Sequence, residues 1–259
     1  MILPPGTILQ QMYLKERLRS LSGGRFIEVG AGQGIVSKTL LDLGWSGRAY
    51  DLNAQSLAVA AQLNRSAVSQ GRYQLEQRDW LDVAMPEPVD LVVSCMVLEH
   101  LAEADEARYL QHCRRALKPR GLGVLFVPGC PDYWGMEDEV AGHFRRYTFQ
   151  SLQRGVEAHG LRLRHVAGLT YPLSNLLFPV SEFLVRRAER SKLALSAEER
   201  TRLSGNRAVP FKTSFPPALR IILNEWVLYP LHLLQKINAQ NPRSLVIYAE
   251  FSAAHVDPV

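Results

Sequence analysis

A strand that leads directly into a glycine-rich turn and a helix is the feature that most constrains the fold of this chain. The strand and turn span residues 25–34, which read RFIEVGAGQG. Phe26, Ile27 and Val29 form the apolar run of a buried strand, and apolar residues then recur at helical spacing over residues 35–43. Glycines at such a turn let a ligand approach the backbone beside the free N–H groups of a helix N-terminus. The sequence therefore predicts an α/β fold with a ligand site at this turn.

The spacing of the glycines separates two classes of cofactor site. The dinucleotide fingerprint Gly-x-Gly-x-x-Gly would place its third glycine at Ile35, whereas in this chain the third glycine is Gly34. Glu28, just before the first glycine, is a second departure from that fingerprint. The series Glu-x-Gly-x-Gly-x-Gly resembles motif I of the class I S-adenosylmethionine (SAM) dependent methyltransferases. This resemblance implies that SAM is the cofactor and that Glu28 faces its methionine end.

Further positions match that family in the expected order. Asp51 ends a short predicted strand at residues 47–51, where βαβ geometry puts a carboxylate beside a ribose. The resemblance implies that Asp79 bonds the adenine amino group and that Trp80 flanks the ring, with a core role for Trp80 as an equal alternative. The expected cofactor-binding residues are Glu28, Gly30, Ala31, Gly32, Gly34, Asp51, Leu52, Asp79, Trp80, Cys95 and Met96.

The order of the predicted strands indicates how the sheet is built. After the first two, strands are expected at residues 73–77, 89–95, 122–127 and 162–169. The antiparallel seventh strand of the family is assigned to residues 244–251, which alternate and are rich in β-favouring residues. We therefore expect a Rossmann-like class I methyltransferase sheet of seven strands with a helical insertion between strands six and seven. The predicted units are an N-terminal helix at 1–22, a SAM-binding domain at 23–171 and 244–259, and a helical cap at 172–243.

The insertion at residues 172–243 concentrates the positive charge of the chain. The formal net charge is +5 overall, and this segment alone holds 11 Lys and Arg against five acids. Apolar residues recur at helical spacing at 176–184 and again at 218–234, but the second stretch is interrupted by charges and falls short of the ~20 apolar residues that span a bilayer. We expect a basic helical cap over the acceptor site. A lid, a homodimer interface and a peripheral membrane contact all stay open for it.

Two histidines are candidates for the general base that an acceptor hydroxyl would need. His143 lies in the sequence GHFRRY after the fifth strand, and His100 ends the sequence LEH after the fourth. A structural role for each histidine is the alternative. The residues expected to contact the acceptor come from the same aromatic and polar loop, and they are Arg145, Arg146, Tyr147 and Trp134. Salt bridges to the acids at 137–139 explain the two arginines at least as well.

No metal is expected from the sequence. Quinone-type O-methyltransferases carry an acid three residues before the glutamate of their Glu-His pair, and that acid completes a magnesium site. In this chain the position is Met96, whose thioether is a poor ligand for a hard cation. Glu99 and His100 alone are an incomplete ligand set.

The resemblance implies SAM-dependent methylation, and we expect an O-methyltransferase of a small or amphiphilic metabolite, including anionic, lipid-linked or sugar-linked ones. N- or C-methylation stays open, because the donor motifs do not set the acceptor. A non-catalytic SAM- or partner-binding module is a second alternative, and the glycine spacing disfavours a NAD-dependent oxidoreductase. Nucleic acid is not an expected partner, since residues 94–97 read SCMV where base-amino methylation would need an N-P-P-Y type signature. Three separated cysteines and no visible secretory signal predict a cytoplasmic protein, with contact at the inner face of a membrane left open.

Overall fold

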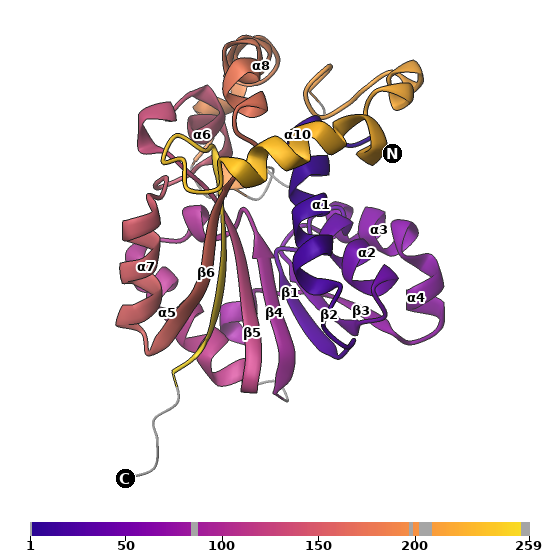
Figure 1. Ribbon diagram of the computed structural model, residues 1–259, viewed down its shortest axis with the longest axis vertical. Coiled ribbons are helices and arrows are strands. Elements are labelled where there is room, and N and C mark those ends of the chain that lie inside the picture. The colour runs from indigo at the N-terminus through magenta and orange to yellow at the C-terminus, as the bar shows by residue number, and fades with distance from the viewer. Residues whose placement is uncertain (1, 84–87, 197–198, 202–208, 255–259) are drawn as a thin grey trace.

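A mixed sheet of seven strands forms the centre of the molecule (Figure 1). The computed structural model describes residues 2–83, 88–196, 199–201 and 209–254. Its strands are β1 (Arg25–Val29), β2 (Ser46–Asp51), β3 (Tyr73–Gln77), β4 (Val89–Cys95), β5 (Leu117–Pro128), β6 (Leu161–Leu169) and β7 (Val246–Ala253). They lie in the order β3-β2-β1-β4-β5-β7-β6, with β1 to β5 parallel and β7 antiparallel to both of its neighbours. The predicted fold class is therefore confirmed.

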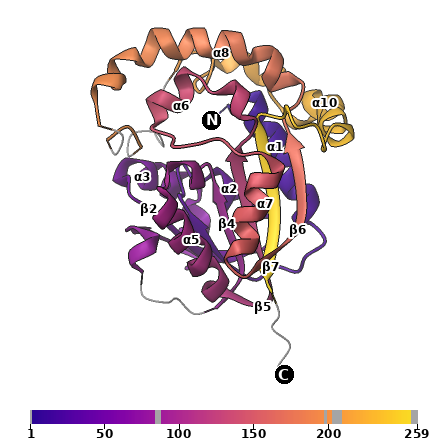
Figure 2. The same cartoon turned by 90° about the vertical axis from the view of Figure 1, so that its left-hand side faces the viewer.

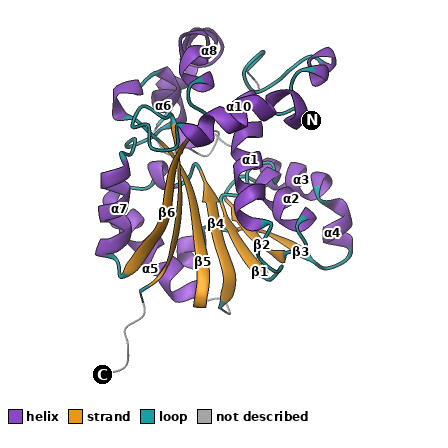
Figure 3. Ribbon diagram, in the orientation of Figure 1, coloured by secondary structure: helices purple, strands orange, loops and turns teal. Residues whose placement is uncertain are grey.

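Helices cover both faces of the sheet (Figure 3). One face carries α1 (Pro5–Leu18), α2 (Ile35–Asp42), α3 (Ala54–Leu63) and α4 (Arg65–Ser69), and the other carries α5 (Glu103–Ala116) and α7 (Phe149–Ala158). Successive strand residues point to opposite faces, so Phe26 packs with α1 and α2 while Ile27 packs with α5. Burial on both sides explains why β4, which reads VDLVVSC, is mainly apolar in sequence.

Asparagines lie at the ends of helices in two places. α3 and α4 meet at Asn64, whose buried side-chain amide donates to the carbonyls of Gly34 at 3.1 Å and Ala60 at 3.0 Å. The helix expected at 218–234 is replaced by η5 (Pro217–Ile221) and α10 (Glu225–Ile237), because the Asn224 side chain accepts from the Val227 N–H and starts a new helix. At Asn224, local capping thus overrides the apolar periodicity.

The segment between β6 and β7 lies over one end of the sheet. It includes α8 (Leu173–Glu189), η4 (Arg190–Ala194), η5 and α10, and Figure 2 shows α8 running across the top of the molecule. α10 rests on α1, where Leu228 packs against Ile8, Leu9 and Met12. The Gln235 amide donates to the Leu9 carbonyl at 3.1 Å and fixes the two helices in register. In the described part of the chain, no helix is long and apolar enough to cross a membrane.

A short helix below α8 links this segment to the loop that follows β5. It is α6 (Met136–Ala141), and its N-terminal N–H groups face the Glu182 side chain of α8. The Glu182 carboxylate accepts from the Met136 N–H at 2.8 Å and from the Glu137 N–H at 3.4 Å. A carboxylate at a helix N-terminus is favourable because it meets unpaired N–H groups and the positive end of the helix dipole. α6 is therefore held in place by α8.

Candidate active site

A large cavity of about 1060 Å³ opens at the C-terminal ends of the parallel strands. Ligands of open α/β sheets usually bind at this edge. One wall comes from the glycine turn and from the residues that follow β2, β3 and β4, and the opposite wall comes from α8, η5 and residues 201, 211–213 and 215. The N-terminal residues 4–7, ahead of and at the start of α1, also reach the cavity.

The glycine turn holds an acid at the edge of this cavity. Gly30 and Gly32 have positive φ angles of 74° and 48°, a region that side chains disfavour. The Gly32 N–H donates to Asp51 Oδ2 at 2.8 Å, and the Asn53 N–H donates to Asp51 Oδ1 at 2.8 Å. A Cβ added at Gly32 would meet nothing within 4 Å, so a ligand has room to approach that backbone. The two oxygens of Asp51 are fixed and each keeps a lone pair for a ligand hydroxyl.

Most of the expected cofactor-binding residues line the cavity with the glycine turn. The lining includes Gly30, Gly32, Asp51, Leu52, Asp79, Trp80, Cys95 and Met96. Trp80 also serves the core, since it is 2% exposed and packs edge-on to Tyr109 at 5.3 Å between ring centroids. Met96 has a left-handed backbone with φ of 56°, which is unusual for this residue type and turns the chain sharply at the end of β4.

Glu28, Ala31 and Gly34 are expected cofactor-binding residues that do not line the cavity. The Glu28 side chain is buried and receives a hydrogen bond from the Ser37 hydroxyl of α2. Burial raises the pKa of Glu28 to about 8, so the carboxyl is largely protonated at neutral pH. Ala31 is buried, and a Cβ at Gly34 would collide with Ala60. These three residues shape the turn and its contact with α2, and none of them is part of the cavity lining.

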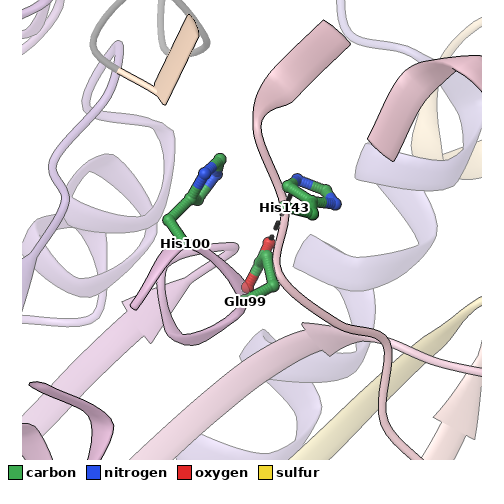
Figure 4. A group of neighbouring side chains, drawn as sticks. All are labelled: Glu99, His100 and His143. Carbon is green, nitrogen blue, oxygen red and sulfur yellow. Dashed lines mark ion pairs between the residues drawn. The ribbon is translucent and has the colours of Figure 1, made fainter. Parts of the chain in front are cut away.

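The two candidate histidines meet beside a buried glutamate (Figure 4). We call Glu99, His100 and His143 the histidine cluster. Glu99 and His100 belong to η2 (Leu98–His100) after β4, and His143 lies in the loop after α6. The His143 Nε2 atom is 3.9 Å from Glu99 Oε1, and the imidazole rings of His100 and His143 are nearly perpendicular with centroids 4.6 Å apart. The Phe144 N–H donates to the Glu99 carbonyl at 2.7 Å and thereby pins the loop against η2.

The charges around His143 fix its orientation. The His143 Nδ1 atom lies 2.8 Å from Asp138 Oδ1, and Arg146 Nε donates to the same carboxylate at 2.9 Å. Burial acts to raise the pKa of Asp138, but the hydrogen bonds from His143 and Arg146 lower it below its usual value. An ionised carboxylate only accepts hydrogen bonds, so Nδ1 of His143 carries the proton between them. The Nε2 atom is left to face Glu99 and the cavity.

Burial also perturbs the other two members of the histidine cluster. It raises the pKa of Glu99 to about 7, although the neighbouring His143 offsets part of this effect. It lowers the pKa of His100 to about 3, and repulsion from His143 adds to the shift. His100 is therefore a neutral imidazole at physiological pH. Strongly shifted pKa values beside a cavity are a frequent property of catalytic and ligand-binding groups.

The four residues expected to contact the acceptor are divided between the cavity and the protein interior. Arg146 lines the cavity and is paired with Asp138. This is one of the salt bridges that the sequence offered as an alternative to acceptor binding. Arg145 instead forms an ion pair with Glu106 of α5, and the buried Tyr147 donates to the same carboxylate at 3.2 Å. Alternate residues of an extended loop point to opposite sides, which separates Arg146 from its two neighbours. Trp134 is 42% exposed and outside the cavity lining.

Sequence reasoning missed two acids of this site. Glu99 was considered only as half of a Glu-His pair, and Asp138 only as a salt-bridge partner of the arginines. Their proximity to His143 arises because the loop after β5 folds back onto η2, which no local pattern encodes. The spacing of Asp138 five residues before His143, across a helix C-terminus, was the available signal.

Comparisons with known proteins agree on one family. A family model described as "Methyltransferase domain" matches residues 27–122. The chain is 31% identical over 176 residues to the ubiquinone biosynthesis O-methyltransferase of Pseudomonas putida (strain F1), covering 63% of this chain and 75% of that protein. It is 33% identical over 115 residues to the protein of the same name from Xylella fastidiosa (strain M23), where the match spans only 45% of the relative's length and 44% of this chain.

Solved structures show the same fold at lower identity. A SAM-dependent methyltransferase from Mesorhizobium loti is similar over 94% of this chain and 99% of its own, with a TM-score of 0.55 and 17% identity. The magnesium protoporphyrin IX methyltransferase of Synechocystis, with S-adenosylhomocysteine bound, is similar over 64% of this chain and 77% of its own, with a TM-score of 0.54 and 14% identity. At these identities the likeness supports the fold alone.

Proposed function

This chain belongs to the class I SAM-dependent methyltransferases, and on that premise we propose that it methylates an oxygen atom of an amphiphilic acceptor. The observation that carries the proposal is the continuity of the cavity. The same space joins the donor turn at Gly32 and Asp51, the imidazoles of His100 and His143, and the wall formed by α8 and η5. Donor and acceptor must meet in line in a site that excludes water, and such a space serves both.

The wall opposite the donor turn favours an acceptor with an apolar body. Its side chains are mainly aliphatic and aromatic, and they include Leu177, Phe178, Val180, Leu184, Phe215, Leu219 and Leu223. Each methylene group that such a wall removes from water contributes about 0.8 kcal/mol to binding. The names of the Pseudomonas and Xylella relatives support oxygen as the acceptor atom.

The histidine cluster is the proposed site of proton removal. In the transfer, the acceptor oxygen bonds to the methyl carbon while the bond from that carbon to the sulfonium sulfur breaks, and the hydroxyl proton has to leave. His143 presents Nε2 for this role, since Asp138 holds the proton on Nδ1. The nearby Glu99 carboxyl favours the positive charge that His143 would acquire.

We also propose that the cap contacts an acidic membrane surface. Trp226, Ile221 and Ile237 are 91%, 79% and 82% exposed, an unusual degree for large apolar side chains. Leu177 and Ile222 are exposed as well and line the cavity, so the cavity mouth has an apolar rim. The segment 172–243 carries 11 basic and five acidic residues. Basic charge beside exposed apolar side chains is typical of surfaces that lie in a lipid interface.

A matched pair of acceptors tests the proposed function. The protein is incubated with radiolabelled SAM and a hydroxylated aromatic acid, with and without a long alkyl chain, and the products are identified by mass spectrometry. We expect a methyl ether and at least a tenfold preference in kcat/KM for the alkylated acceptor, because two buried methylene groups already contribute roughly 1.6 kcal/mol. Equal use of both acceptors would contradict the proposed preference for an amphiphilic acceptor. Transfer only to amines would contradict the proposal that oxygen is the acceptor atom.

A further inference from the structure

The histidine cluster contains a buried carboxyl group that lacks a conventional partner. Glu99 is 0% exposed, and within the described residues neither of its oxygens accepts a hydrogen bond from another residue. One ligand atom each from Glu99, His100 and His143 lies within 4.8 Å of the others. Buried polar groups are normally paired, and an unpaired buried carboxylate is costly. A cation bound between the three side chains would supply the missing partner of Glu99.

The surroundings of His143 match those of a metal ligand. Its Nδ1 atom is held by Asp138 at 2.8 Å, and the Asp138 carboxylate is held in turn by both Arg146 and the Gly135 N–H. A histidine that binds a metal through one nitrogen usually donates its other N–H to a carboxylate, which fixes the tautomer and the ring. Asp138 would do this here, and Nε2 then points towards Glu99.

We propose that Glu99, His100 and His143 bind one divalent transition-metal ion, with zinc the best match. Two imidazoles and one carboxylate form a common ligand set of catalytic zinc, which keeps a fourth position open. His100 and His143 both line the cavity, so the open position faces the space for the acceptor. Magnesium is a poor match, since it prefers oxygen ligands and this set offers only one carboxylate.

Binding of a zinc ion requires the three ligand atoms to move closer together. Atoms that are each about 2.0–2.2 Å from a tetrahedral zinc ion are ~3.4 Å apart, so the His143 Nε2 to Glu99 Oε1 distance of 3.9 Å has to close by about half an ångström. The widest pair of the cluster, which lies within 4.8 Å, has to close by up to about 1.4 Å. The sequence predicted no metal because Glu99 and His100 were incomplete as a pair, and the fold adds His143 as the third ligand.

The site rests on this geometry, whereas its use in catalysis rests on the proposed function. An ion at this position would act as a Lewis acid that lowers the pKa of the acceptor hydroxyl, so that the hydroxyl proton would leave to solvent as the acceptor binds. His143 would then be a ligand of the ion, and this role would replace the proton removal proposed for it above.

Metal binding by the full-length chain tests the inference without donor or acceptor. Chelator-treated protein is titrated with zinc sulfate by calorimetry and with cobalt(II) by visible absorption. We expect one ion per chain and a cobalt spectrum with nitrogen ligation. Glu99→Gln and His100→Asn should each weaken zinc binding at least 100-fold and remove that spectrum. Asp138→Asn should weaken zinc binding 10- to 100-fold through His143. His159→Asn is the matched control, because His159 lies outside the cluster and its Nδ1 atom is hydrogen-bonded to the Gly155 carbonyl at 2.8 Å.

Two results would overturn the inference. One is the absence of stoichiometric zinc binding, and the other is stoichiometric binding that survives both Glu99→Gln and His100→Asn in folded protein. The melting temperature and the affinity for S-adenosylhomocysteine establish that each variant is folded. A failure to bind zinc would refute the metal site and would leave the proposed methyltransferase function standing. A chain that binds zinc at the cluster but methylates nothing would refute the proposed function alone.

Discussion

Asp51 offers the sharpest test of where the donor binds. Each oxygen of its carboxylate already accepts one backbone N–H at 2.8 Å, from Gly32 and from Asn53, and each retains a lone pair towards the cavity. We expect these lone pairs to accept the two ribose hydroxyls of SAM. A hydrogen bond to a charged group contributes about 1.5–3 kcal/mol net. Asp51→Ala should therefore weaken binding of S-adenosylhomocysteine by at least that amount, which is roughly 10- to 150-fold in Kd.

Calorimetry with S-adenosylhomocysteine measures this loss directly. Asp42→Ala is the matched control, since Asp42 is an exposed carboxylate of α2 that pairs with Lys38 and lies outside the cavity lining. Asp51→Ala also deprives two backbone N–H groups of a partner, so the melting temperature of each variant has to be recorded. A folded Asp51→Ala protein with unchanged affinity would show that Asp51 does not contact the donor. It would also contradict the assignment of the cavity end beside Asp51 to the ribose of SAM.

Three further predictions concern catalysis, stability and the cap. His143→Ala should lower turnover roughly 100-fold or more, whether His143 takes the proton or holds an ion, while S-adenosylhomocysteine affinity stays within about twofold; near-normal turnover would exclude His143 from the chemistry. The pKa of Glu28 is raised to about 8 in the folded chain, so the folded state binds more protons than the unfolded state above pH ~4.5. The free energy of unfolding should therefore fall by up to about 4–5 kcal/mol as pH rises from 4.5 to 8. Glu28→Gln should lose that slope in urea titrations at pH 5 and pH 8, and an unchanged slope would show that Glu28 is ionised throughout. Trp226→Ser with Ile237→Ser should abolish co-flotation with acidic lipid vesicles and leave a neutral-vesicle control unchanged; a dimer dissociated by the same changes would instead identify the face as a subunit interface.

The parallel core of the fold was predictable because its strands are buried on both faces. β3 and β4 match the predicted residues, and Asn53 and Thr148, whose side chains favour N-cap positions, cap α3 and α7. β7 was found from its alternation, although a long segment separates it from β6. Local chemistry was sufficient for these elements, since apolar runs, caps and glycine turns act over a few residues.

The contacts that define the candidate site were less accessible to the sequence. Whether Arg145 or Arg146 faces the cavity depends on the phase of one extended loop, and Trp80 belongs to both the core and the cavity wall. The meeting of His143 with Glu99 depends on the hydrogen bond from the Phe144 N–H to the Glu99 carbonyl, which joins residues far apart in the chain. Pairings of this kind are set by tertiary packing, and residue type alone does not reveal them.

The position of α6 implies that the way an acceptor packs against α8 affects the rate of turnover. Its N-terminus is held by Glu182 of α8, and its residue Asp138 holds His143. An acceptor that seats badly against α8 would displace a helix of only six residues, and that displacement reaches the imidazole. Poor acceptors should then be penalised in kcat more than in KM. In a lineage that adopts a bulkier acceptor, compensating substitutions should accumulate at this helix before any appear at the donor turn.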